Sequence, residues 1–269
     1  LPRMARLYFD PDSKYKSYGL DGNIVPVVFD EDRNGIIDGA NDFVRIIFGM
    51  RRGGDRYYAL DVTNKNQPQM LWISSPAELG QSWSTPVVAR VDAPGVNSNK
   101  AVVVLGGGYD PAHDTNTHPA VDDAQGAAII MLDLESGAEL WRASRNGGSN
   151  DLNLASMKRS IPGGIRVIDI SGDGFADRMY AADLGGQILR FDIHNGTTGS
   201  GFVTGGVIAQ LGAEGLSGTP SLPDTRRFYT SPDVSLFNSN ELDARFLAIS
   251  LGSGYRAHPL DNINSDRFF

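Results

Sequence analysis

The chain contains no cysteine among its 269 residues. Disulfides, thiolate metal sites and cysteine nucleophiles are therefore excluded together. The sequence also lacks long apolar runs: the longest uninterrupted one, 127–132, is far short of the roughly 20 residues that a membrane-spanning helix needs. We therefore expect no membrane span in this chain.

Positive charge is in the minority. Lysine and arginine total 24 against 32 acidic residues, which gives a net charge of −8. This balance argues against a phosphate-backbone partner, so we expect no nucleic acid. With 41% hydrophobic and 21% charged residues, the composition is typical of a folded globular protein long enough to bury a sizeable core.

Turn-forming residues are abundant, with 32 glycines and 14 prolines in a chain that is not of low complexity. Apolar runs between them are short and rich in β-branched or aromatic residues, which predicts strands. These runs cover residues 24–29, 43–48, 57–60, 87–91, 101–105 and 127–132. Their continuous apolarity predicts strands buried on both faces, as in stacked sheets. The predicted fold class is all-β.

A repeat appears when the strand ends are aligned. An apolar segment ends in aspartate at Asp61, Asp133, Asp192 and Asp261, at spacings of 72, 59 and 69 residues. Each unit has a glycine-containing strand end upstream, and the second and fourth also have a Thr-Pro pair, at 85–86 and 219–220. We expect three or four antiparallel strands per unit, with the aspartate accepting backbone N–H bonds in a turn. Trp72 and Trp141, which follow two of these aspartates, are expected to pack between units.

Four-stranded units around an axis are β-propeller blades, usually of about 40–50 residues. Inserted loops at 92–100 and 109–126 explain the longer spacing here. About four blades are recognisable, whereas a closed ring has up to about eight. Since the chain also begins with Leu1 rather than methionine, we expect residues 1–269 to be a single β-propeller domain or part of one, with the N-terminal portion of the full protein missing.

The sharpest chemical signal is a nine-residue loop with oxygen-bearing groups at positions 1, 3, 5, 7 and 9 and Gly174 at position 6. The predicted Ca²⁺ ligands are Asp169, Ser171, Asp173, Asp177 and, through its carbonyl, Phe175. This spacing folds alternate oxygens around one hard cation, as at the start of an EF-hand loop. Tyr180 stands where an EF-hand has its bidentate glutamate, and strand-like flanks predict that the loop joins two strands. The alternative is a plain Asp/Gly turn, in which three clustered carboxylates would repel one another.

A second loop repeats the pattern with Gly35 at position 6. Its predicted ligands are Asp30, Asp32, Asn34, Asp38 and, through its carbonyl, Ile36. Asn41 or Asp42 could complete the coordination shell. A simple turn is a stronger alternative here, because nothing else in this unit indicates a metal site.

Other signals point away from catalysis. His113 and His118 lie among four aspartates, at 110, 114, 122 and 123, but the spacing matches no standard metal site. We interpret this segment as a solvated acidic loop. The glycine triplet at 106–108 is not followed by the Lys-Ser/Thr of a phosphate loop, and no Gly-x-Ser-x-Gly elbow is present. We therefore predict no catalytic residues and no enzyme.

Several segments together resemble one known family, the C-terminal β-propeller domain of the PilC/PilY type IV pilus tip-associated adhesins. They are 48–54, 57–63, 80–88, 106–110, 169–186 and 190–192. The similarity runs in order over about residues 20–255. It implies a modified seven-bladed propeller with one calcium loop, matching Asp169–Asp177 here. Ser171 departs from the commoner Asn or Asp, and the loop at Asp30 is not carried over from the family.

The resemblance also implies a role and a location. A bacterial cell-surface or pilus-tip protein is expected, outer membrane-associated or extracellular. It would support pilus assembly and twitching motility, oppose retraction in a calcium-dependent way and aid attachment. The implied partners are pilin or minor pilins, and a host or abiotic surface contacted through the full-length protein.

Two other classes remain as alternatives. An integrin-like adhesion propeller carries similar calcium loops, although there they recur in several consecutive blades. A PQQ-type quinoprotein dehydrogenase has comparable Leu-Asp and Leu-Trp strands, but the chain has neither vicinal cysteines nor an evident catalytic cluster.

Overall fold

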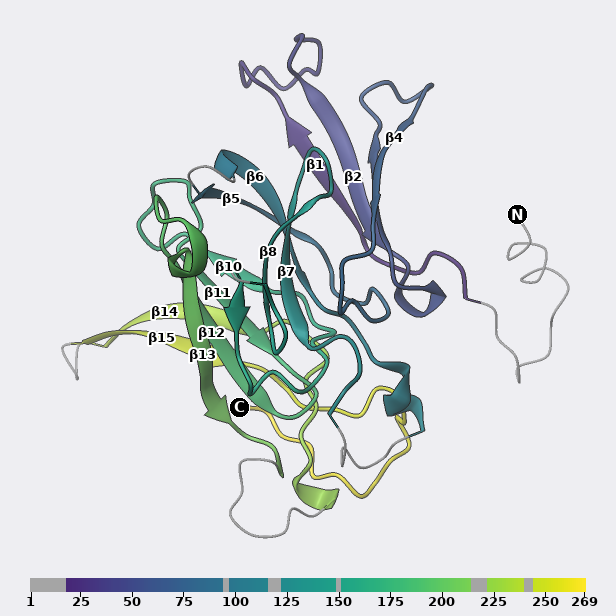
Figure 1. Ribbon diagram of the computed structural model, residues 1–269, viewed down its shortest axis with the longest axis vertical. Coiled ribbons are helices and arrows are strands. Elements are labelled where there is room, and N and C mark those ends of the chain that lie inside the picture. Colours follow the sequence, from purple (N-terminus) through teal and green to yellow (C-terminus); the bar gives the residue numbers. More distant parts are fainter. Residues whose placement is uncertain (1–17, 94–96, 116–121, 149–150, 214–221, 240–243) are drawn as a thin grey trace, which may run out of the picture.

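A computed structural model describes residues 18–93, 97–115, 122–148, 151–213, 222–239 and 244–269. Within these ranges the chain forms β-strands and short 3₁₀ turns but no α-helix, which confirms the all-β prediction. No helix of the described part is long and apolar enough to cross a membrane. The strands form four sheets that follow one another in chain order (Figure 1).

The first sheet is a four-stranded antiparallel meander. Its strands are β1 (Ile24–Phe29), β2 (Phe43–Gly49), β3 (Tyr57–Asp61) and β4 (Gln69–Ser74), in that order across the sheet. The predicted apolar runs coincide with the first three of these strands. β1 departs from the expectation of two buried faces, since Ile24 is 65% exposed and Val28 60%.

The second sheet has five strands. They are β5 (Val87–Ala93), β6 (Asn97–Gly106), β7 (Ala128–Asp133), β8 (Glu139–Ser144) and β9 (Leu152–Asn153), the last of which pairs parallel to β8. The expected insertion at 92–100 is instead largely strand, because β5 and β6 are long and pair as far as Ala93 and Asn97.

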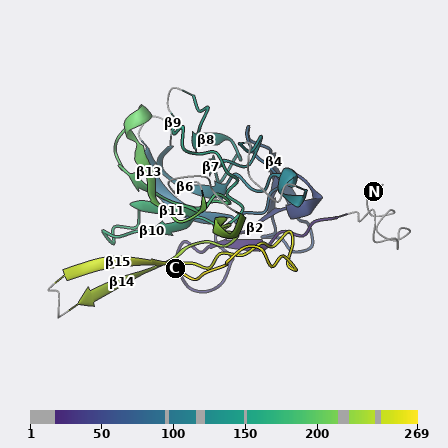
Figure 2. The ribbon, with the colours of Figure 1, turned by 90° about the horizontal axis from the view of Figure 1, so that it is seen from below.

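The third sheet is again a four-stranded antiparallel meander, and the fourth is a hairpin. The third comprises β10 (Arg166–Ile168), β11 (Arg178–Ala182), β12 (Gln187–Ile193) and β13 (Val203–Gln210). The fourth comprises β14 (Asp233–Ser239) and β15 (Ala244–Ser250). The hairpin extends away from the other sheets (Figure 2). The first three sheets have the predicted number of strands per blade or more, whereas the fourth has only two strands within the described residues.

The core lies between successive sheets. Alternate residues of β6 point to opposite sides: Val103 and Leu105 pack with the first sheet, whereas Val102 and Val104 pack with the third. Every residue of β7 is buried. The second sheet is therefore covered on both faces, as its continuous apolar runs predict. A smaller cluster joins the third sheet to the segments around the fourth.

Both predicted inter-blade tryptophans join neighbouring sheets. The indole N–H of Trp72, on β4, donates to the carbonyl of Leu134 after β7 at 2.9 Å. Trp141, on β8, meets Phe191 of β12 edge to face, with ring centroids 6.4 Å apart. Gly137 lies flat against Trp72, since a Cβ at this position would come within 2.5 Å of the indole.

The repeated aspartates accept backbone N–H bonds, as expected, in three of four units. One of these is the fourth unit, in which the Asp261 carboxylate accepts from the amide of Asn264. The Asp61 carboxylate accepts from the amide of Thr63, and that of Asp133 from Glu135 and Ser136. Asp192 instead bonds to two arginine side chains, from Arg178 and Arg190.

The strand end predicted in the fourth unit is wrong. Residues 258–261 form a turn rather than a strand end. The predicted Thr-Pro pair at 219–220 lies outside the described residues, and Thr230–Ser231–Pro232 is the segment that leads into β14.

The segment after β15 returns to the second sheet. The Tyr255 hydroxyl donates to the carbonyl of His113, and the His258 ring bonds to the carbonyl of Asp114 at 2.8 Å. Both carbonyls belong to η3 (Pro111–Asp114), which follows β6. The last part of the chain thus passes beyond the third sheet and contacts the connection between β6 and β7 of the second.

Candidate functional site

The loop from Asp169 to Asp177 joins β10 to β11, as the strand-like flanks predict. One oxygen of the Asp169 carboxylate accepts from the Gly174 amide at 2.8 Å, and the other accepts from Gly172 at 2.6 Å. Asp173 accepts from the amide of Phe175 at 2.8 Å. Carboxylates thus already organise the main chain around the centre of this loop.

The loop at Asp30, between β1 and β2, folds in the same way. Asp30 accepts from the Gly35 amide at 2.7 Å, which is the same first-to-sixth bond that Asp169 makes. Asn34 accepts from Ile36 at 2.6 Å, which repeats the fifth-to-seventh bond. The two sequence patterns therefore specify one local structure.

Backbone angles extend the match. The sixth residue is glycine in both loops, with φ of +83° at Gly35 and +91° at Gly174. The fourth residue is also left-handed, at Gly172 with φ +78° and at Arg33 with φ +58°. A non-glycine residue in this region costs roughly 1–2 kcal/mol, so the loop at Asp30 keeps the shared geometry against local preference.

The loops are closed by different carboxylates. In the later loop, the ninth residue, Asp177, accepts from the amides of Ile170 and Ser171, both at 2.7 Å. In the earlier loop, Asp42 does this instead, accepting from Glu31 and Gly39. Asp38, the predicted ninth-position ligand, makes no side-chain hydrogen bond within the described residues.

These contacts favour the ionised carboxylates. Hydrogen bonds from backbone amides, that of Gly174 foremost, lower the pKa of Asp169 below its usual value. The amide of Glu31 and then that of Gly39 likewise lower the pKa of Asp42. Both loops thus hold negative charge at neutral pH.

The residues present fit a hard oxygen-seeking cation in one respect. The Asp30 Oδ1 atom is buried and has no hydrogen-bond partner among the described residues. A buried oxygen of this kind is available to coordinate a cation. On the other hand, no three His, Cys, Asp or Glu side chains within the described ranges converge as ready metal ligands. Calcium binding by either loop therefore stays a prediction.

The later loop is attached to the neighbouring sheet. The amide of Ala176 donates to the carbonyl of Arg90 on β5 at 2.8 Å, and the Arg90 guanidinium lies 5.1 Å from the Phe175 ring. Asn195, after β12, bridges the same junction, accepting from the Asp92 amide and donating to the Ala176 carbonyl. The loop is therefore a joint between the second and third sheets.

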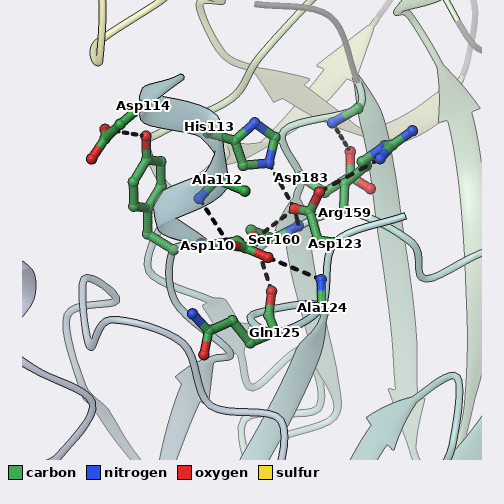
Figure 3. Close-up of polar contacts among 12 residues, drawn as sticks. Asp110, Ala112, His113, Asp114, Asp123, Ala124, Gln125, Arg159, Ser160 and Asp183 are labelled. Carbon is green, nitrogen blue, oxygen red and sulfur yellow. Dashed lines mark hydrogen bonds and ion pairs between the residues drawn. The ribbon is translucent and has the colours of Figure 1, made fainter. Parts of the chain in front are cut away.

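The prediction that residues 109–126 form a solvated acidic loop is wrong for three of its acidic and histidine side chains. Asp110 and His113 are buried, 5% and 3% exposed, and the side chain of Asp123 is 6% exposed. His118 lies outside the described residues. His113, Ser160 and Arg159 are directed towards the carboxylate of Asp123 (Figure 3). Their bonded atoms lie 2.7, 2.7 and 3.5 Å from its oxygens.

This buried cluster holds together segments that are far apart in the sequence. Burial opposes ionisation of Asp123, but hydrogen bonds from His113 and Ser160 outweigh it and lower its pKa. The Ser160 hydroxyl donates directly to Asp123 and accepts from the Asp110 amide, so it is not aligned for activation by a histidine base. Sequence reasoning missed Ser160 because its partners lie 37 and 50 residues away in the chain.

Comparisons with known proteins point in one direction. The family model described as the PilY1 β-propeller domain matches residues 12–201, more than two thirds of the chain. The type IV pilus biogenesis factor PilY1 of Pseudomonas aeruginosa strain PAO1 is 32% identical over 154 residues, and that of strain UCBPP-PA14 is 34% identical over 178 residues. A PilY1 homolog of Xylella fastidiosa is 27% identical over 154 residues.

These alignments cover 55%, 64% and 55% of this chain but only 11%, 13% and 10% of the relatives. The chain thus corresponds to a small part of the length of the proteins it matches. The crystal structure of the Pseudomonas aeruginosa PilY1 C-terminal domain superposes with a TM-score of 0.58 at 23% identity, over 88% of this chain and 45% of that one. This supports the propeller fold, and the family match favours the first of the three functional interpretations. The chain belongs to the PilY1 β-propeller domain family.

Proposed function

We propose that this chain is the calcium-binding propeller portion of a type IV pilus biogenesis factor and that its role is mechanical rather than catalytic. The observation that carries the proposal is the loop at Asp169–Asp177, where the Asp169 carboxylate accepts from the amides of Gly172 and Gly174 and the amide of Ala176 is bonded to the adjacent sheet. An ion held there would fix the joint between the second and third sheets.

The ion's chemistry suits the oxygens that the loop offers. Ca²⁺ takes six to eight oxygen ligands from carboxylates, carbonyls and water. Asp169, Asp173 and Asp177 supply carboxylates, and Ser171 and the Phe175 carbonyl supply neutral oxygens. Bound calcium would offset the mutual repulsion of the three carboxylates and so stabilise the loop.

The earlier loop is proposed as a second calcium site of the same design. Its donors would be Asp30, Asp32, Asn34 and the carbonyl of Ile36, with Asp38 or Asp42 completing the shell. The unpartnered Asp30 Oδ1 supports this proposal.

At the level of the whole protein, the names of the relatives support a role in type IV pilus biogenesis. We propose that the full-length protein acts at the cell surface or pilus tip and contacts pilin or minor pilins. Calcium would set its resistance to pilus retraction, and the full-length protein would mediate attachment to host or abiotic surfaces.

Calorimetric titration with Ca²⁺ tests the site. Asp173→Asn removes one charge but keeps the oxygen that accepts from Phe175, so the loop should fold as before. We expect this variant to bind calcium at least about tenfold more weakly than the wild type. Asp55→Asn, in an exposed turn of the first sheet, is the matched control and should leave the isotherm unchanged. Identical isotherms for wild type and Asp173→Asn would reject the Asp169 site.

The cellular role needs the full-length protein. In a strain whose own copy has been deleted, complementation with the wild-type protein should give a number of surface pili that depends on calcium. Complementation with the Asp173→Asn form should give a weaker dependence. Equal pilus counts and twitching zones at low and high calcium for both forms would contradict the proposed control of retraction.

A further inference from the structure

A cavity of about 440 Å³ lies where the segments leading into all four sheets meet. Asn23 precedes β1, Thr85 precedes β5, Gly164 precedes β10 and Ser231 precedes β14, and each contributes to the wall. The Asn23 amide donates to the Thr85 hydroxyl at 2.9 Å. A Cβ on Gly164 would lie 3.6 Å from the Thr85 carbonyl oxygen and 3.8 Å from the Ser231 Cβ. Equivalent positions of the four repeats thus surround one space.

The charged side chains that line this cavity are all positive. Its lining includes three arginines, Arg51, Arg166 and Arg256, but no aspartate or glutamate. Arg166 is neutralised by Asp233, 3.3 Å away. Neither Arg51 nor Arg256 forms an ion pair with any residue in the described ranges. Two guanidinium groups with unused hydrogen-bonding capacity therefore border the cavity.

Both groups lie close to one indole ring. The guanidinium carbon of Arg51 is 5.3 Å from the ring centre of Trp83, and that of Arg256 is 5.5 Å from it. Trp83 is itself stacked on Tyr109, at 4.5 Å between ring centroids. Cation–π attraction can hold an arginine in place without using its N–H donors on an acid. The two charges are thereby positioned but not neutralised.

The backbone of Arg51 is in an unusual conformation. Its φ is +49°, in the left-handed region that costs a non-glycine residue roughly 1–2 kcal/mol. The Arg51 amide donates to the Ser82 carbonyl at 3.2 Å, which helps to hold this conformation. Residues kept in such conformations cluster at ligand-binding sites. The turn therefore keeps a strained arginine at the cavity, where glycine or asparagine would fit the backbone better.

We propose that this cavity binds an organic anion, whose carboxylate or phosphate group is held by Arg51 and Arg256. Planar guanidinium groups match the geometry of both oxyanions. The apolar part of the ligand would lie against Val87, Ile165 and Val167, which also line the cavity. The volume is in the range of small-molecule sites. This site is separate from both calcium loops and does not depend on the proposed calcium binding.

Four probes separate the contributions. Benzoate carries one carboxylate on an apolar ring, benzamide is its neutral counterpart, phenyl phosphate replaces the carboxylate, and inorganic phosphate lacks the ring. Binding is followed by calorimetry and by the NMR signal of the Trp83 indole N–H. We expect benzoate or phenyl phosphate to shift that signal saturably, the tighter of the two identifying the preferred oxyanion. Benzamide and inorganic phosphate should bind at least about tenfold more weakly.

The variants test the assigned residues. Arg51→Asn removes the charge and places at this position a residue that tolerates φ > 0, so the fold should be kept or stabilised. We expect it and Arg256→Gln each to weaken binding at least about tenfold. Arg56→Gln, an exposed arginine of the same turn region that does not line the cavity, should bind as wild type does.

Three results would overturn the proposal. Equal binding of benzoate and benzamide would show that charge is not recognised. Unchanged affinity in the folded double variant Arg51→Asn/Arg256→Gln would show that these two arginines do not hold the ligand. An equal loss of affinity in Arg56→Gln would show that binding depends only on the general electrostatic field of the protein.

Discussion

The amide of Ala176, in the loop between β10 and β11 of the third sheet, donates to the carbonyl of Arg90, on β5 of the second sheet, at 2.8 Å. The bond involves the penultimate residue of the loop at Asp169–Asp177. A change in this loop is therefore transmitted directly to β5 of the preceding sheet. If calcium binds as proposed, its effect reaches beyond the hairpin that holds it.

The side chain of Asn195 gives the first test of this joint. Asn195→Ala removes two hydrogen bonds, one from the Asp92 amide at 2.9 Å and one to the Ala176 carbonyl at 3.0 Å. We expect the free energy of unfolding to fall by about 1–3 kcal/mol, measured by urea denaturation. Calcium affinity should fall as well, because the loop loses an anchor. As a control, Asn64→Ala alters an exposed turn and should change calcium affinity little.

The closing carboxylate of the earlier loop gives the second prediction. Asp42→Ala leaves the amides of Glu31 and Gly39 without their acceptor, whereas Asp38→Ala removes no hydrogen bond of the described side chains. In calcium-free buffer we expect Asp42→Ala to lower the urea midpoint clearly more than Asp38→Ala. Equal midpoints would show that Asp42 does not close this loop.

The third prediction concerns close approach between sheets. Gly137 and Gly196 both have positive φ, +67° and +85°, so alanine should strain the backbone similarly at each. A Cβ at Gly137 would lie 2.5 Å from the Trp72 ring, while one at Gly196 would have nothing within 4 Å. We expect Gly137→Ala to be the more destabilising by about 1–3 kcal/mol in thermal or urea unfolding. A smaller cost at Gly137 than at Gly196 would contradict the packing of Trp72 on this turn.

The fourth prediction is acid sensitivity. Hydrogen bonds from His113 and Ser160 lower the pKa of the buried Asp123, against the effect of its burial. The unfolded chain then binds more protons than the folded one near pH 4, the usual pKa of aspartate being about 3.9. The stabilisation is therefore complete above this range and is lost as the pH falls through the lower, folded-state pKa.

Unfolding free energies measured from pH 7 to pH 2.5 test this sign. We expect Asp123→Asn to be less stable at neutral pH and to lose less stability on acidification than wild type. Asp55→Asn, on the surface, should follow the wild-type curve. A wild-type curve that rises towards acid pH would refute the assignment.

Local sequence patterns predicted the strands well. The run 24–29 is β1 to the residue, and 127–132 differs from β7 by one residue at each end. Alternating oxygens and a glycine at position 6 also predicted that both loops share one geometry. These features depend on neighbours within a few positions, where residue preference and turn chemistry act directly.

Features that depend on distant partners were not predictable in this way. The segment around His113 has the composition of a solvated loop, and only Ser160 and Arg159, brought from the next repeat, make it a buried cluster. The role of Asp42 could be guessed but not separated from that of Asn41. The charges of Arg51 and Arg256 are 205 positions apart in the sequence, and only the meeting of the repeats places them at one cavity.

The return of the final segment to η3 has a consequence for cooperativity. In a simple linear array each repeat is stabilised by its immediate neighbours alone, so an array can unravel from one end. Here Tyr255 and His258 bond to carbonyls more than 140 residues earlier, in η3 of the connection between β6 and β7 of the second sheet. Loosening the last segment therefore weakens the second sheet as well as the fourth. We expect the four sheets to unfold in a single transition rather than blade by blade.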